Sequence, residues 1–188
     1  MGFFGKHRLV AHPDHPPMTV RSVDVDLRPA QNGGLFLSYA VEPAGSLRLS
    51  DYGPERRDGL WNSTCFELFL KAADGGYREF NFAPLMAWNA YRFTGWRQGM
   101  AALELADAPH LVDLRVDDRR GSFPARYELD VVLTGEALAE ASRQASLTAV
   151  IEEADGTKSY WALAHPPGAP NFHNPACFTL ELPPAPAK

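Results

Sequence analysis

The chain has 188 residues, of which 45% are hydrophobic and 11% aromatic, enough for one sizeable core and too few for two. A formal net charge of −5 without any basic stripe excludes the usual electrostatics of nucleic-acid binding. Residues 1–17 lack the apolar run of a signal peptide, and no later run reaches the length of a membrane span. We therefore expect a single domain, residues 1–188, that is cytoplasmic and binds neither nucleic acid nor membranes.

Alternation of apolar and polar residues with a period of two predicts strands along most of the chain. Residues 20–29 alternate valine and leucine with aspartate, and residues 35–41 return after the turn signal Asn32-Gly33-Gly34. Further strands are predicted over residues 65–71, 77–83, 87–93, 110–117, 126–133, 146–153, 159–165 and 177–182. Residues 135–145 are the one good helical segment. This pattern predicts an all-β fold, an antiparallel β-sandwich of immunoglobulin-like or carbohydrate-binding-module-like type with one short helix.

Polar side chains interrupt two of these predicted strands. Residues 65–71 place Glu67 opposite the phenylalanine and leucine side chains of their strand, and residues 77–83 do the same with Glu79 and Asn81. The intervening Ala-Asp-Gly-Gly is a hairpin signal. If it joins the two strands, both carboxyl groups and the amide lie together on the face away from the core.

The third strand, residues 87–93, has two possible orientations. One places Trp88 and Arg92 on the polar face, and the other places Tyr91 and Phe93 there. We expect Trp88 and Arg92 on the polar face, because Tyr91 and Phe93 continue the apolar side. The expected core residues are Phe66, Leu68, Phe80, Phe82, Tyr91 and Phe93.

Two interpretations of this polar face are open. It is either an ordinary solvent-exposed face with cross-strand ion pairs or a binding face for a polyhydroxylated ligand. A sugar offers C–H surfaces to aromatic rings and hydroxyl groups to carboxylates and amides, so the second interpretation suits these residue types.

A family resemblance bears on this choice. The segments "LWNSTCFELFL", "YREFNFAP", "AWNAYRF" and "SYWALAHPPGAPNFHNPACFTLEL", which span about Leu60 to Leu182, resemble the bacterial DOMON-like proteins, which are similar to family 9 carbohydrate-binding modules. The resemblance implies a β-sandwich with sugar or, in some relatives, haem as ligand. It implies that Trp61 and Trp161, with Trp96 as a third candidate, clamp a sugar ring. Trp61 could equally cap the core at the start of its strand.

Cofactor sites have weak support in the sequence. Haem-binding relatives use methionine and histidine as axial ligands, but the chain lacks the C-x-x-C-H attachment motif. The candidates would be Met86, Met100, His110, His165 and His173. His165 and His173 are a candidate metal-binding pair, yet no third ligand is evident. We expect no cofactor, and we expect both cysteines, Cys65 and Cys177, to be free thiols.

Catalytic motifs are absent from the sequence: it has no G-x-S-x-G, P-loop, H-E-x-x-H or Gly-rich nucleotide fingerprint. Glu67 and Glu79 could serve glycoside hydrolysis if they faced each other at the right separation. We expect a non-catalytic carbohydrate-binding-type module for a carbohydrate or small polar ligand. The alternatives are an enzyme or accessory protein acting on a small polar metabolite, and a haem-binding module. The expected ligand-binding residues are Trp61, Glu67, Glu79, Asn81, Trp88, Arg92, Trp96, Trp161 and His173.

Overall fold

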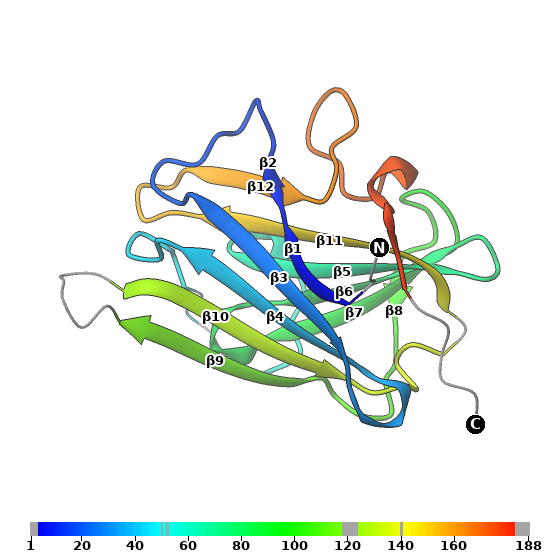
Figure 1. Ribbon diagram of the computed structural model, residues 1–188. Coiled ribbons are helices and arrows are strands. Elements are labelled where there is room, and N and C mark those ends of the chain that lie inside the picture. Colours follow the sequence, from blue (N-terminus) through cyan, green and yellow to red (C-terminus); the bar gives the residue numbers. More distant parts are fainter. Residues whose placement is uncertain (1–3, 50, 52, 118–123, 140, 183–188) are drawn as a thin grey trace.

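Two antiparallel sheets packed face to face make up the chain (Figure 1). The structure is a computed structural model and describes residues 4–49, 51, 53–117, 124–139 and 141–182. The layers follow from the alternation in the sequence, because each sheet turns its apolar side chains toward the other. The expectation of an all-β sandwich is therefore confirmed.

The first sheet has five strands in the order β1–β3–β4–β10–β9. The bounds of its strands are β1 Gly5–Arg8, β3 Ser22–Pro29, β4 Leu35–Glu42, β9 His110–Asp117 and β10 Pro124–Leu133. The hairpin between β3 and β4 turns through the 3-10 segment η1, Gln31–Gly33, at the expected glycine pair.

The second sheet has the order β2–β12–β11–β5–β6–β7–β8, and a further strand, β13, pairs with β11. The bounds of its strands are β2 Val10–Ala11, β5 Cys65–Ala72, β6 Tyr77–Phe82, β7 Trp88–Phe93, β8 Ala101–Ala102, β11 Ala141–Glu152, β12 Lys158–Ala162 and β13 Leu180–Glu181. The connections of this sheet contain the single 3-10 turns η2 Leu60–Asn62, η3 Pro84–Met86 and η4 Pro175–Cys177.

The main core lies between the sheets. Phe66 and Leu68 of β5 and Phe80 and Phe82 of β6 are fully buried there, as expected. From the first sheet, Tyr39 enters the core and donates a hydrogen bond from its hydroxyl to the Glu67 carbonyl oxygen at 2.8 Å. This polar contact joins the two sheets through the core at the backbone of Glu67, whose side chain points to the opposite face of its sheet.

The expected orientation of β7 is wrong. Its register places Trp88 opposite Phe82 and Arg92 opposite Arg78, on the side of the sheet that faces the core. Trp88 packs against the main core, whereas Tyr91 and Phe93 lie on the outward face. On the outward face the Tyr91 hydroxyl donates a hydrogen bond to Asp58, which satisfies the polar group of this buried ring there.

The expected helix over residues 135–145 is also wrong. Residues 135–139 form turns, and β11 begins at Ala141. Ala145 is fully buried and pairs with Leu70 of β5. Alanine and glutamate favour a helix intrinsically, but the strand pairing and burial available here outweigh that small preference.

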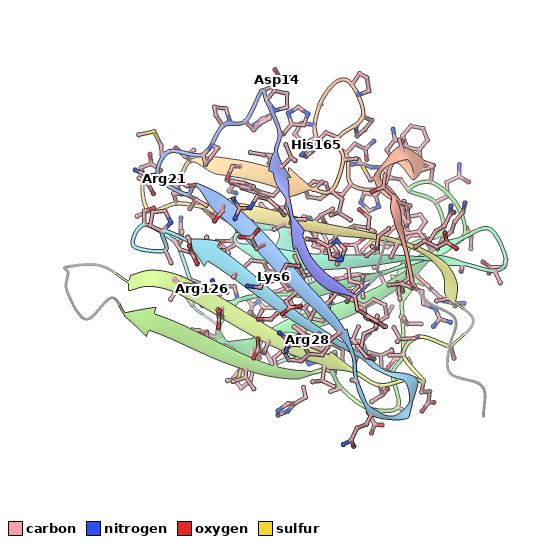
Figure 2. All side chains as sticks on the ribbon, in the orientation of Figure 1. Lys6, Asp14, Arg21, Arg28, Arg126 and His165 are labelled. Atoms are coloured by element: carbon pink, nitrogen blue, oxygen red, sulfur yellow. The ribbon has the colours of Figure 1, made fainter. Side chains whose placement is uncertain are left out.

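The outward face of the five-stranded sheet carries the ordinary charge pairs of a solvated surface. Figure 2 shows Lys6, Arg28 and Arg126 on this face. Arg126 forms an ion pair with Glu42 at 2.6 Å, and Arg28 pairs with Asp26. The solvent-face interpretation therefore describes this sheet rather than the polar residues of β5 and β6. Among the described residues, no helix is long and apolar enough to cross a membrane.

Candidate functional site: an aromatic cavity with a carboxyl floor

The outward face of the eight-stranded sheet is covered by loops that leave a cavity of about 340 Å³. This volume lies at the lower end of the range of small-molecule sites. Side chains from β5, β6, β7, β11, β12 and three loops line it: Trp61, Glu67, Phe69, Glu79, Phe93, Arg97, Met100, Val150, Tyr160, Pro170, Phe172 and His173.

The floor of the cavity is the polar patch that the sequence predicts on β5 and β6. Glu67 pairs with Asn81 across the two strands, and Glu79 lies two residues further along β6. The residues are almost completely buried, with relative exposures of 2% for Glu67, 4% for Glu79 and 0% for Asn81. The expectation that these three side chains share one face is confirmed.

Each floor carboxyl accepts one hydrogen bond from the sheet. The Thr148 hydroxyl donates to Glu67 Oε2 at 2.7 Å, and Asn81 Nδ2 donates to Glu79 Oε1 at 2.9 Å. Glu79 Oε2 and Asn81 Oδ1 are buried and accept no hydrogen bond from the described part of the chain. Buried acceptors of this kind are costly unless a partner reaches them, so the floor is built to receive donors from the cavity.

Burial shifts both floor carboxyls toward the protonated form. Desolvation, with the neighbouring Glu79 charge adding to it, raises the pKa of Glu67 to about 8. Desolvation also raises the pKa of Glu79 to about 7, opposed by the Asn81 hydrogen bond and the positive charge of Arg97. Around neutral pH the pair therefore shares protons rather than carrying two full charges.

The walls are aromatic and form a second hydrophobic cluster outside the main core. Phe69, Tyr77, Phe93 and Phe172 are buried in it. The rings of Tyr77 and Phe93 stack with centroids 4.5 Å apart and an interplanar angle of 9°. These rings exclude water from one side of the floor and offer apolar faces to a ligand.

Trp61 stands at the edge of the cavity and is 38% exposed. Its ring lies edge-on to Tyr91, with centroids 5.7 Å apart. The Tyr91 hydroxyl and Asn89 Nδ2 each donate to Asp58 Oδ1 at 2.8 Å, and Arg56 Nε donates to Asn89 Oδ1 at 2.9 Å. This network ties the loop before β5 to β7, and so positions the indole at the cavity mouth.

His173 closes the opposite wall from the loop after β12. Its Nδ1 is hydrogen-bonded to the Tyr77 hydroxyl at 2.8 Å and lies 3.9 Å from Glu79 Oε2. Burial, with the charge of Arg97 adding to it, lowers the pKa of His173 to about 4. The ring is therefore neutral at neutral pH. The Arg97 backbone N–H donates to the same Tyr77 hydroxyl at 3.2 Å.

Five of the expected ligand-binding residues do not line the cavity. Asn81 is fully buried beside the floor carboxyls and does not reach the cavity itself. Trp88 and Arg92 lie on the core-facing side of β7. Trp161 is buried in the main core, where its indole N–H donates to Ser159. Trp96 is 56% exposed and lines a smaller neighbouring cavity of about 70 Å³. A clamp made of Trp61 and Trp161 is therefore wrong, because the two indoles are on opposite sides of the sheet.

Several lining residues were missed from the sequence. The sequence predicts Phe93 in the core, but it lines the cavity. Tyr160 and Trp161 are adjacent, so they face opposite sides of the sheet, and alternation does not show which of them faces the cavity. Phe172 lies in the loop at 165–175, and loops of this length in a compact domain are more often functional than idle. Arg97 follows β7 in a tight turn with a positive φ of 53°, which alternation does not reveal.

Two buried thiols lie beneath the loops that carry Trp61 and His173. Cys65 packs with Leu60, Ala83 and Ala87, below η2. Cys177 ends η4, and its thiol contacts the Asn171 carbonyl oxygen at 3.4 Å. Both are free and buried, as expected.

The residues considered as metal or haem ligands are dispersed. Met100 and His173 line the cavity, whereas the His165 ring packs against His12 at 4.9 Å and bonds the Val10 carbonyl beside β2 (Figure 2). Among the described residues, no group of three or more histidine, cysteine, aspartate or glutamate side chains is placed to hold a metal.

Comparison with known proteins supports the fold. No protein-family model matches the chain, and no curated protein matches it. A solved structure described as a "putative carbohydrate-binding protein" from Bacteroides uniformis superposes with a TM-score of 0.68. The match has 15% sequence identity and covers 93% of this chain and 84% of that one. The chain thus shares its β-sandwich with that protein across nearly its whole length.

Proposed function

We propose that this protein is a binding module for a small carbohydrate, held in the cavity above β5 and β6. The observation that carries the proposal is the pair of buried carboxyl groups, Glu67 and Glu79, at the base of an aromatic-walled cavity, where Glu79 Oε2 accepts no hydrogen bond from the described part of the chain. Sugars present adjacent hydroxyl donors on one edge and C–H surfaces on their faces, which matches this division of polar floor and aromatic wall.

The contacts of the bound sugar follow from the placement of the side chains. Hydroxyl groups would donate to Glu67 and Glu79, and the edge of the ring would pack against Trp61 and Phe172. The neutral His173 ring would accept or donate one further hydrogen bond from the wall. The shared fold with a protein described as carbohydrate-binding supports the assignment without identifying the sugar.

Cavity size argues for a short ligand. A volume of about 340 Å³ accommodates one or two sugar units but not an extended polysaccharide chain. The resemblance of the sequence to family 9 carbohydrate-binding modules and DOMON-like proteins is consistent with this proposal.

Intrinsic tryptophan fluorescence titration would test the proposal, with D-glucose, D-galactose, D-xylose, cellobiose and maltose as probes. We expect a saturable change in emission with one sugar class. In Trp61→Ala, which removes the aromatic edge of the cavity, calorimetry should show the affinity reduced about tenfold, or about 1.4 kcal/mol.

Trp96→Ala is the matched control, because it removes an exposed indole that does not line this cavity. It should bind the same sugar with unchanged affinity. The proposal is wrong if none of the five sugars binds at millimolar concentration, or if Trp61→Ala and Trp96→Ala reduce affinity equally.

A further inference from the structure

We propose that Glu67 and Glu79 form an acid–base pair that opens and recloses the ring of a reducing sugar bound in the cavity, and so interconverts its two anomers. This inference rests on the proposed function and adds an activity to it. It starts from the fact that the floor holds two carboxyl groups where hydrogen bonding to a sugar would need only neutral amides.

Position on the sheet places the two carboxyls side by side. Glu67 is on β5 and Glu79 on the adjacent β6, displaced by two residues from the direct partner Asn81. Such diagonal neighbours are roughly 7–8 Å apart at the backbone, within reach of one another's long side chains. Both side chains are at least 95% buried and line the same cavity.

The shared floor favours ring opening over hydrolysis. A glycosidase places its two carboxyls on either side of the bond that it breaks. Here both rise from one sheet face and approach a ligand from the same side. They can reach two oxygens bonded to one carbon, and the anomeric hydroxyl oxygen and the ring oxygen of a reducing sugar are such a pair.

The step balances without any other reactant. The Glu79 carboxylate takes the proton of the anomeric hydroxyl, the bond between the anomeric carbon and the ring oxygen breaks, and the anomeric C=O double bond forms. Protonated Glu67 gives its proton to the ring oxygen. Rotation about the adjacent C–C bond and the reverse step close the ring as the other anomer, and the pair retains one proton throughout.

The contacts of each carboxyl suit its role. Glu79 faces the positive Arg97 and keeps Oε2 without a partner among the described residues, so it is the base. Glu67 is the more deeply buried of the two, and burial disfavours its charged form, so it retains the proton. The aromatic walls keep water from the pair, which strengthens its interactions with a bound sugar.

The neighbouring side chains whose pKa is shifted titrate away from neutral pH. Burial raises the pKa of Tyr77, Tyr91 and Cys65, and burial lowers that of His173 to about 4. These side chains, the cationic Arg97 and Tyr160 of β12 are the described titratable or charged groups around the pair. The anomer exchange rate should therefore be highest when the pair holds a single proton and fall at more acidic and more alkaline pH.

Polarimetry on freshly dissolved α-D-glucose, α-D-galactose and α-D-xylose tests this activity, with sugar binding measured in parallel by tryptophan fluorescence. We expect the wild-type protein to accelerate equilibration of a sugar that binds, in proportion to protein concentration. Glu79→Gln and Glu67→Gln should still bind it and lose at least tenfold in rate, since acid–base catalysis supplies about 10²–10⁴-fold. Glu104→Gln, at an exposed position outside the cavity, should keep the full rate.

The outcomes separate this inference from the proposed function. Binding without acceleration, or acceleration that survives both glutamine substitutions, overturns the acid–base pair and leaves the binding module standing. Absence of both binding and acceleration overturns both. If a glutamine variant does not fold, the wild-type pH profile decides, because a rate that does not fall on both sides of a maximum contradicts the pair.

Discussion

Buried glutamate side chains in this protein differ in how well the fold stabilises their charged form. Glu67 and Glu79 are buried side by side, and their raised pKa values mean that ionising them costs folding free energy. Glu153 is also buried, but it accepts five hydrogen-bond donors and its pKa is lowered. The fold thus stabilises the charge of Glu153 but not the charges of the floor pair, in line with the proposal that the pair serves ligand binding.

The floor pair should make stability fall as pH rises. Glutamate in the unfolded chain titrates near 4.5, whereas Glu79 in the folded chain titrates at about 7. Between these values the folded state holds more protons than the unfolded state, so raising the pH favours unfolding. In Glu79→Gln, the loss of unfolding free energy between pH 5 and pH 8 should be smaller by at least about 1.4 kcal/mol.

Urea denaturation at the two pH values measures this difference. The exposed Glu104→Gln variant serves as control and should keep the wild-type pH dependence. An identical pH dependence in Glu79→Gln and wild type would show that the Glu79 pKa is not raised in the folded protein.

Elements far apart in the sequence are tied together by the end of β11. The Glu153 carboxylate, just after that strand, accepts the backbone N–H groups of Met18, Thr19 and Val20 at 3.0, 2.9 and 3.2 Å. It also accepts the hydroxyl of Ser46 at 3.0 Å. One side chain thus holds the segment that leads from β2 to β3 and the loop that leads from β4 to β5, two connections that pass between the sheets.

Glu153→Gln should therefore destabilise the fold by about 2–3 kcal/mol at pH 7, since hydrogen bonds to charged groups contribute about 1.5–3 kcal/mol and are not additive. Denaturant unfolding measures the loss, and hydrogen exchange should show faster exchange of the residue 18–20 amides. Glu152→Gln is the adjacent control. It loses only an ion pair to the half-exposed Arg48, and should cost less than about 1 kcal/mol. Equal losses in the two variants would contradict the tying role of Glu153.

The whole molecule is two sheets with different outward faces. One face is a solvated array of ion pairs, and the other carries the cavity. A hydrogen bond joins the two sheets through the core, where the Tyr39 hydroxyl donates to the Glu67 carbonyl oxygen. The opposite sheet therefore helps to fix the backbone of β5 beneath the cavity floor.

Tyr39→Phe tests this link between the sheets. The ring continues to pack against Phe66, 5.0 Å away, so the sandwich should still form. Loss of one buried hydrogen bond should lower the free energy of unfolding by about 0.5–1.5 kcal/mol, measured by thermal or urea denaturation. No loss of stability would mean that the Glu67 carbonyl oxygen does not depend on Tyr39.

The sequence predicts the orientation of a strand well where a tight turn connects it to the strand before it. The tight Ala-Asp-Gly-Gly turn sets the pairing of β5 with β6, so alternation alone places Glu67, Glu79 and Asn81 on one face. The β6–β7 connection instead passes through Leu85 and Met86 at positive φ values of 59° and 68°, and its length shifts the register in a way that alternation does not reveal. The lining residues supplied by loops depend on tertiary packing and carry no periodic signal.

The reactivity of the Cys65 and Cys177 thiols reports on movement of the loops that cover them. Burial raises the pKa of Cys65 well above its usual range and that of Cys177 to about 11, so both remain unreactive thiols while the loops are closed. One lies beneath the Trp61 segment and the other beneath the His173 segment. Alkylation of either sulfur requires the segment above it to move away, so the alkylation rate measures that movement on its own side of the cavity.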